Sequence, residues 1–107
     1  MNEDEKLSKV IEDLKQDGIK AAVLTRTGET VVSSFNTKGI GQLIAKAYNT
    51  AQLLMAENED KIGNFTIKGD SRYIFIYEIG EGKLLVGISS KEEDEKIIRG
   101  SALMLKG

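Results

Sequence analysis

Few side chains in this sequence are suited to catalytic chemistry. The 107 residues include no cysteine and no histidine. Their absence excludes disulfides, thiolate metal ligands, the commonest metal ligand and the usual general base. Catalysis would have to rely on carboxylates, lysines, hydroxyl groups or tyrosines alone. We therefore expect a protein that is not an enzyme and that has no catalytic residues, no metal site and no cofactor.

The remaining candidates for acid–base or nucleophilic chemistry are weak. Asp70, Glu78 and Glu81 surround the strongest strand pattern, and paired carboxylates can act as acid and base when their environments differ. Two of the three, however, fall in predicted turns, where they are solvated. The hydroxyl candidates also lack an activating base, because no histidine or suitable Ser-x-x-Lys pair accompanies them. These hydroxyl groups belong to Ser33, Ser34 and Ser89.

A glycine-containing turn, Gly39-Ile40-Gly41, stands between a predicted strand and a predicted helix. A phosphate-binding turn occupies that position in nucleotide-binding proteins. Here Ile44 replaces the third glycine of a dinucleotide fingerprint, and no G-x-x-x-x-G-K-[ST] pattern occurs. We interpret the glycines as the entry to a helix. The formal net charge of −2 also gives no reason to expect binding to nucleic acid.

Length and hydropathy set the broad class. A chain of 107 residues suits one domain, which we expect over residues 1–107. The beginning of the sequence is acidic and then amphipathic, unlike a signal peptide. No apolar run approaches the ~20 residues that cross a bilayer. We expect a cytoplasmic protein that is not inserted in a membrane.

The elements that position these groups are organised around residues 71–89. Two strand-like runs are joined there by Gly80-Glu81-Gly82, a connection typical of a β-hairpin. In the first run Tyr73, Phe75, Tyr77 and Ile79 alternate with Ile74 and Ile76. A strand that is apolar on both faces must be covered on both sides. We expect the centre of a sheet with helices above and below, and aromatic side chains that form core and not a base-stacking platform.

The flanking patterns predict the order helix, two strands, helix, three strands, helix. Residues 19–26 predict an inner strand, and residues 30–35, with two serines, an edge strand. Capping boxes are predicted from Asn2 with Glu5 for the first helix and from Ser90 with Glu93 for the last. The helical stripes are Leu7, Val10, Ile11 and Leu14 in the first helix and Ile97, Ile98, Ala102 and Leu105 in the last.

The predicted helix from residue 40 to about residue 58 has an unusually wide apolar face. Its arc of roughly 140° exceeds the ~100° that a core-facing stripe requires. The arc comprises Ile40, Leu43, Ile44, Ala47, Tyr48, Ala51, Leu54 and Met55, with Ala45 and Ala56 beyond it. Leu53 lies on the polar side among Gln42, Lys46 and Asn49. Either the core stripe is simply wide, or part of it is left for another chain.

Residues 64–68 predict a short strand with Phe65 and Ile67 on one face. At the end of a meander, such a strand keeps an unpaired edge of N–H and C=O groups. The same strand of a second copy can satisfy that edge.

Taken together, these patterns resemble the Roadblock family of small α/β domains, named after a dynein light chain. The similar pieces are Ala21-Ala22-Val23-Leu24 through Gly28 and Val31-Val32, Ile40 to Ala56, Phe65-Thr66-Ile67, Tyr73-Ile74-Phe75-Ile76, and Leu84-Leu85-Val86-Gly87-Ile88 before a last helix. They cover nearly the whole chain. One departure is Thr25, where the family often has an aspartate.

The resemblance implies a three-layer α-β-α, profilin/longin-like fold with a five-stranded antiparallel sheet. The second helix is expected on one face and the other two helices on the opposite face. It also implies a homodimer in which second helices pack together and third strands join into one ten-stranded sheet. Family members typically act as non-catalytic platforms for small Ras-like GTPases or as motor light chains.

Three hypotheses follow. The first is a homodimeric adaptor that binds and regulates a small GTPase; the second is a structural scaffold or motor-type subunit without a GTPase partner. The third is a small-ligand sensor, although the sequence shows no convergent polar cluster. The predicted dimer interface comprises Ile40, Leu43, Ala47, Ala51, Leu54, Phe65 and Ile67. The predicted partner contacts are Gln42, Lys46, Asn49 and Leu53.

Overall fold

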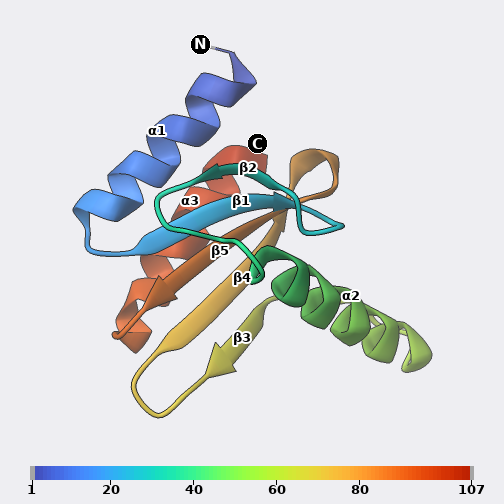
Figure 1. The fold of residues 1–107 in the computed structure, drawn as a ribbon. Helices are drawn as coiled ribbons and strands as arrows, with labels where there is room; N and C mark the ends of the chain where they lie inside the picture. Colours follow the sequence, from blue (N-terminus) through green and yellow to red (C-terminus); the bar gives the residue numbers. More distant parts are fainter. Residues whose placement is uncertain (1, 107) are drawn as a thin grey trace.

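The predicted order of helices and strands is confirmed by the computed structural model, which describes residues 2–106 (Figure 1). The elements are α1 (Glu3–Gln16), β1 (Lys20–Thr25), β2 (Thr30–Ser33), α2 (Gly41–Glu57), β3 (Phe65–Lys68), β4 (Tyr73–Ile79), β5 (Lys83–Ser89) and α3 (Glu95–Lys106). Short 3-10 turns at Gly80–Gly82 and Glu92–Asp94 precede β5 and α3.

The five strands form one antiparallel sheet in the order β2-β1-β5-β4-β3. The hairpin of β4 and β5 occupies the interior as predicted, and β5 pairs with β1 on its other side. The inner position of β1 and the edge positions of β2 and β3 are also confirmed. Because β3 is an edge, its N–H and C=O groups on the side away from β4 face no other strand within residues 2–106.

Helices cover both faces of the sheet, with α1 and α3 on one side and α2 on the other (Figure 1). The larger core lies under α1 and α3 and contains Phe75 and Tyr77 of β4 together with Leu85 of β5. The smaller core lies under α2 and contains Ile76, Leu84 and Val86 of the same strands. Successive side chains of the hairpin therefore point into two different cores. Phe75 and Tyr77 are core residues, as predicted.

The start of α1 is also as predicted, whereas the predicted start of α3 is wrong. The Asn2 side chain accepts a hydrogen bond from the Glu5 N–H at 2.8 Å, and its amide donates to the Glu5 carboxylate at 3.0 Å. Before α3 the residue that precedes the Glu92–Asp94 turn is Lys91, which makes no side-chain capping bond, and Ser90 is exposed; the serine that contacts the turn is Ser89. Ser89 accepts from the Lys91 N–H at 3.0 Å, and its hydroxyl donates to Asp94. Ser89 ends β5 with its side chain inward, so it can reach the turn.

The β1–β2 turn fixes the beginning of α2. Thr25 supplies a turn contact itself, since its hydroxyl accepts a hydrogen bond from the Glu29 N–H at 3.0 Å. Gly28 has φ +93°, and a Cβ there would lie 2.5 Å from Gln42 Cα. A Cβ on Gly41 would lie 2.5 Å from the Gly28 carbonyl oxygen. Two glycines therefore allow the turn and the first turn of α2 to touch through their backbones.

The wide apolar arc of α2 is only partly used by the sheet. The side chains of Ile44 and Tyr48 are buried, as is that of Ala45, at 2% exposure. The placement of Ala45 beyond the buried face is thus wrong. The helix is rotated so that its buried face is centred away from Leu43 and Leu54, which leaves one side of the arc in solvent.

Candidate functional site

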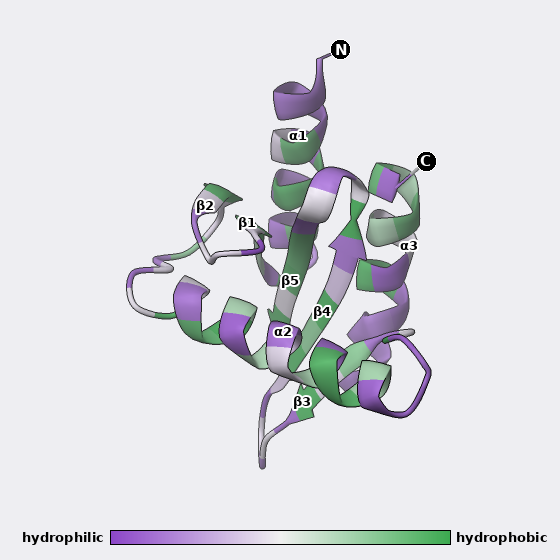
Figure 2. Cartoon of the chain, turned by 90° about the vertical axis from the view of Figure 1, so that its right-hand side faces the viewer, coloured by the Kyte–Doolittle hydropathy of each residue, from purple (hydrophilic) through white to green (hydrophobic). Residues whose placement is uncertain are grey.

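One side of α2, with Ile40 just before it, carries an apolar stripe, which we call the α2 stripe; it consists of Ile40, Leu43, Ala47, Ala51 and Leu54, and the two alanines are half-buried. Its leucines are unusually open, with Leu43 67% and Leu54 62% exposed. Figure 2 shows hydrophobic segments along α2, with β3 below it. Exposed apolar patches of this kind mark interaction surfaces. The structure thus places five of the predicted interface residues on one continuous side of the helix.

The other two predicted interface residues lie on β3. Phe65 is half-buried and contacts the Tyr48 ring edge-on, with ring centroids 6.2 Å apart, whereas Ile67 is 39% exposed. A cavity of about 210 Å³ between α2 and the start of β3 is lined by both Leu54 and Phe65. The α2 stripe and the β3 edge are therefore neighbouring parts of one surface.

A second surface of α2 gathers the predicted partner contacts. Gln42, Lys46, Asn49 and Leu53 line an open hollow of about 360 Å³ together with residues of the β1–β2 turn, including Arg26. They share one side of the helix because they are spaced by three or four residues. Leu53 is 68% exposed. The hollow contains two cationic side chains and no carboxylate in its lining.

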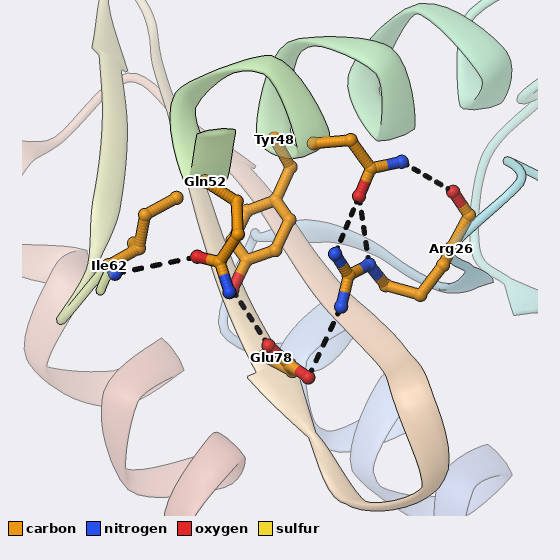
Figure 3. Close-up of polar contacts among 6 residues, drawn as sticks. Arg26, Tyr48, Gln52, Ile62 and Glu78 are labelled. Carbon is orange, nitrogen blue, oxygen red and sulfur yellow. Dashed lines mark hydrogen bonds and ion pairs between the residues drawn. The ribbon is translucent and has the colours of Figure 1, made fainter. Parts of the chain in front are cut away.

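Arg26, Tyr48 and Glu78 meet in a polar network (Figure 3), in which Asn49 has a structural role that the sequence did not indicate. Its amide donates to the Arg26 carbonyl at 2.8 Å, and its Oδ1 accepts from Arg26 Nε and Nη2 at 2.9 and 2.7 Å. Arg26 Nη1 also lies 3.3 Å from the Glu78 carboxylate. The other Glu78 oxygen accepts the Tyr48 hydroxyl at 3.0 Å. This network, Arg26–Asn49–Glu78–Tyr48, joins α2 to β1 and β4.

The network keeps Tyr48 protonated. Burial raises the pKa of its phenol from 10.0 to about 12, and the hydrogen bond to Glu78 adds to the effect. The Arg26 guanidinium lies 5.2 Å from the centre of the Tyr48 ring. The sequence did indicate that Tyr48 has a hydrogen-bond partner, because a tyrosine in a buried stripe needs one for its hydroxyl group. Its partner could not be chosen without the sheet register.

The sequence candidates for chemistry are not brought together. Asp70 precedes β4 and Glu78 lies near its other end, so the length of the strand separates them. Exposed Glu81 pairs with Lys83 at 3.2 Å. The Gly28 carbonyl lies against Gly41, where a phosphate-binding turn would need open backbone. Within residues 2–106 no three side chains are grouped so that they could hold a metal ion.

Hydropathy along the helices gives one further fact. Among residues 2–106, no helix combines the length and apolar character needed to cross a membrane.

The fold defines the class of protein: residues 2–106 adopt the Roadblock/LC7 fold. No family model matches the sequence, and no curated protein matches it significantly. Solved structures, in contrast, match the fold of this chain. The Roadblock/LC7 domain from Streptomyces avermitilis superposes with a TM-score of 0.78 at 16% identity, covering 92% of this chain and 90% of that one.

More particularly, the chain is similar to the gliding protein MglB from Thermus thermophilus. The TM-score is 0.85 at 17% identity, covering 99% of this chain and 90% of that one. Profilin II from Acanthamoeba castellanii also matches, with a TM-score of 0.67 at 16% identity over 94% of this chain and 97% of that one. The resemblance to Roadblock domains is thus confirmed for the fold, and function must be argued from the surfaces.

Proposed function

We propose that the protein is a cytoplasmic, non-catalytic homodimeric adaptor that binds and regulates a small Ras-like GTPase. The observation that carries the proposal is that α2 has two separate exposed surfaces. One is the α2 stripe, which continues to the bare edge of β3. The other is the hollow around Leu53. An adaptor that binds a second copy of itself and a different protein at the same time needs two such surfaces.

The α2 stripe suits a second copy of this chain. Leu43 and Leu54 are 67% and 62% exposed, and full burial of a leucine side chain contributes about 1.5–3 kcal/mol. A two-fold axis uses the same patch twice, so each leucine contributes in both protomers. β3 can pair with its own copy at the same time, which satisfies the edge that the sheet leaves open. The two contacts support the same dimer.

The hollow suits a different protein. Leu53 supplies one apolar anchor and Lys46 supplies positive charge, while the guanidinium of Arg26 at the rim is paired with Glu78. Such a mixture of one apolar anchor and charged groups is usual in interfaces between partners that also exist apart. Because Asn49 is already bonded to Arg26, its role is to hold the arginine at the rim.

The dimer is tested with Leu43→Asp. We expect light scattering to show a dimer for the unmodified chain and a monomer for the variant, because a carboxylate cannot be buried unpaired in an apolar interface. The matched control is Leu103→Asp on α3, since Leu103 is 64% exposed and Leu43 is 67% exposed. A monomeric unmodified chain, or a variant that stays dimeric, would contradict the α2 dimer.

The partner surface is tested with Leu53→Glu. We expect the variant to remain dimeric but to lose capture of purified, GTP-loaded Ras-like GTPases encoded in the same genome. Leu103→Glu, the same change on the opposite layer, should retain capture. Unchanged capture by Leu53→Glu would remove the hollow from the proposal. If no such GTPase binds the unmodified dimer, the scaffold hypothesis replaces the GTPase adaptor.

A further inference from the structure

A second cavity lies where β3 stops pairing with β4. The last pair is Phe65 with Ile76, but β4 continues to Ile79. The chain before β3 leaves the sheet there, and a cavity of about 210 Å³ opens between α2, β4 and α3. It is distinct from the α2 stripe and from the hollow around Leu53. It adjoins the cavity beside Leu54 and Phe65, with which it shares Ile62, Gly63 and Asn64, but its lining includes no residue of the α2 stripe.

The apolar part of the cavity can hold a small organic group. Ile62, Ile76 and Leu103 contribute to its lining from three different elements of the chain. A volume of about 150 Å³ lined by aliphatic side chains is enough to bind benzene. The 210 Å³ available here therefore accommodates a ring of that size together with a short polar group. It is too small for the drug-sized ligands that fill pockets of about 300 Å³ or more.

The charged part of the cavity favours an anion. Arg99 and Lys106 both line it from α3, two turns apart. Glu78 is the only carboxylate in the lining, and its two oxygens are already engaged by Tyr48 and Arg26. Glu78 thus carries a compensated charge. Arg99 forms an ion pair of 3.6 Å with Glu95, which lies outside the lining, so Lys106 is the lining cation that adds positive charge.

We propose that this cavity binds a small organic carboxylate whose apolar body is about the size of a benzene ring. The body lies against Ile76 and Leu103, and the carboxylate faces Arg99 and Lys106. Arginine and lysine form charge-assisted hydrogen bonds with carboxylates, which are stronger than neutral ones. The binding is non-covalent, and no residue of the cavity is assigned a catalytic role.

The test is an NMR titration of the full chain with sodium benzoate at constant ionic strength. We expect saturable shifts of the amide resonances of Gly63, Asn64 and Leu103, which belong to the lining. Benzyl alcohol has the same ring without the charge and should bind at least about tenfold more weakly, as expected for loss of a charged hydrogen bond. Benzoate shifts that never saturate, or equal binding of the alcohol, would overturn the proposal.

Variants locate the site. Arg99→Gln with Lys106→Gln should raise the Kd for benzoate about tenfold or more. Lys6→Gln with Lys38→Gln removes the same charge outside the lining and should leave the Kd unchanged. If both double variants weaken binding equally, the carboxylate is held by net charge and not by this cavity.

A third variant separates this proposal from the adaptor function. Leu103→Glu puts a competing carboxylate into the lining at an exposed position and should abolish benzoate binding. Leu53→Glu should leave it unchanged, although the same variant is expected to lose the GTPase. Benzoate binding that survives Leu103→Glu would count against the cavity, whatever the outcome for the partner.

Discussion

The contact between the β1–β2 turn and α2 can be tested by giving Gly28 a side chain. Its φ of +93° costs a non-glycine residue about 1–2 kcal/mol. The added Cβ of Gly28→Ala would also lie 2.5 Å from Gln42 Cα and 2.7 Å from its nitrogen. These are backbone atoms that cannot rotate away, so an overpacking cost of about 1–3 kcal/mol is added. The lower entropy of the unfolded alanine chain offsets about 0.4–1 kcal/mol.

We therefore expect Gly28→Ala to lower the free energy of unfolding by about 2–4 kcal/mol. With a urea dependence of about 2 kcal/mol per molar, the midpoint should fall by about 1–2 M. The matched control is Gly39→Ala, because Gly39 has a similar φ of +77° and no atom within 4 Å of the added Cβ. Only the backbone term acts there, and the expected loss is about 1 kcal/mol.

All three proteins are compared at one protomer concentration, because self-association stabilises the folded state. If Gly28→Ala and Gly39→Ala lose the same stability, the close approach between the turn and α2 is not rigid. The inference that two glycines hold α2 in place would then be refuted.

Two further predictions concern single side chains. The folded-state pKa of Tyr48, raised to about 12 from 10.0 by burial and the Glu78 carboxylate, makes the unfolded chain ionise first, so stability falls as pH rises from about 10 to about 12. Tyr48→Phe should make that fall less steep in urea unfolding at several pH values; an identical slope would contradict the assignment. Ser89→Ala should cost about 1–3 kcal/mol because Asp94 loses its hydroxyl donor. The same change at exposed Ser90 should cost almost nothing in the same assay, and equal losses would contradict the structural role given to Ser89.

The layered fold could be predicted because it depends on local periodicity. In β4 the side chains on both faces of the strand are apolar, which requires cover on both sides. The structure accordingly places Phe75 in one core and Ile76 in the other. The edge positions of β2 and β3 followed similarly from their short, mixed patterns. Each of these features depends on which residue types alternate within a few positions.

The rest depends on relations between distant segments. Arg26 meets Glu78 only through the strand order and register of the sheet. The rotation of α2, which buries Ala45 and exposes Leu43, accompanies a backbone contact between Gly28 and the start of the helix. The cavity beside Arg99 exists because the chain leaves β4 after Ile76. No local pattern encodes any of these distances.

The central place of β5 has a consequence for synthesis. β1 pairs residue 20 with residue 88 and residue 25 with residue 83, so the strand that completes the middle of the sheet is translated last. A nascent polypeptide halted before residue 83 has β1 flanked by β2 alone, and Ala22 and Leu24 lack their β5 neighbours Leu84 and Val86. Acquisition of the native state must wait for the ribosome to release that final strand, and until then the unfinished chain is a substrate for chaperones and proteases.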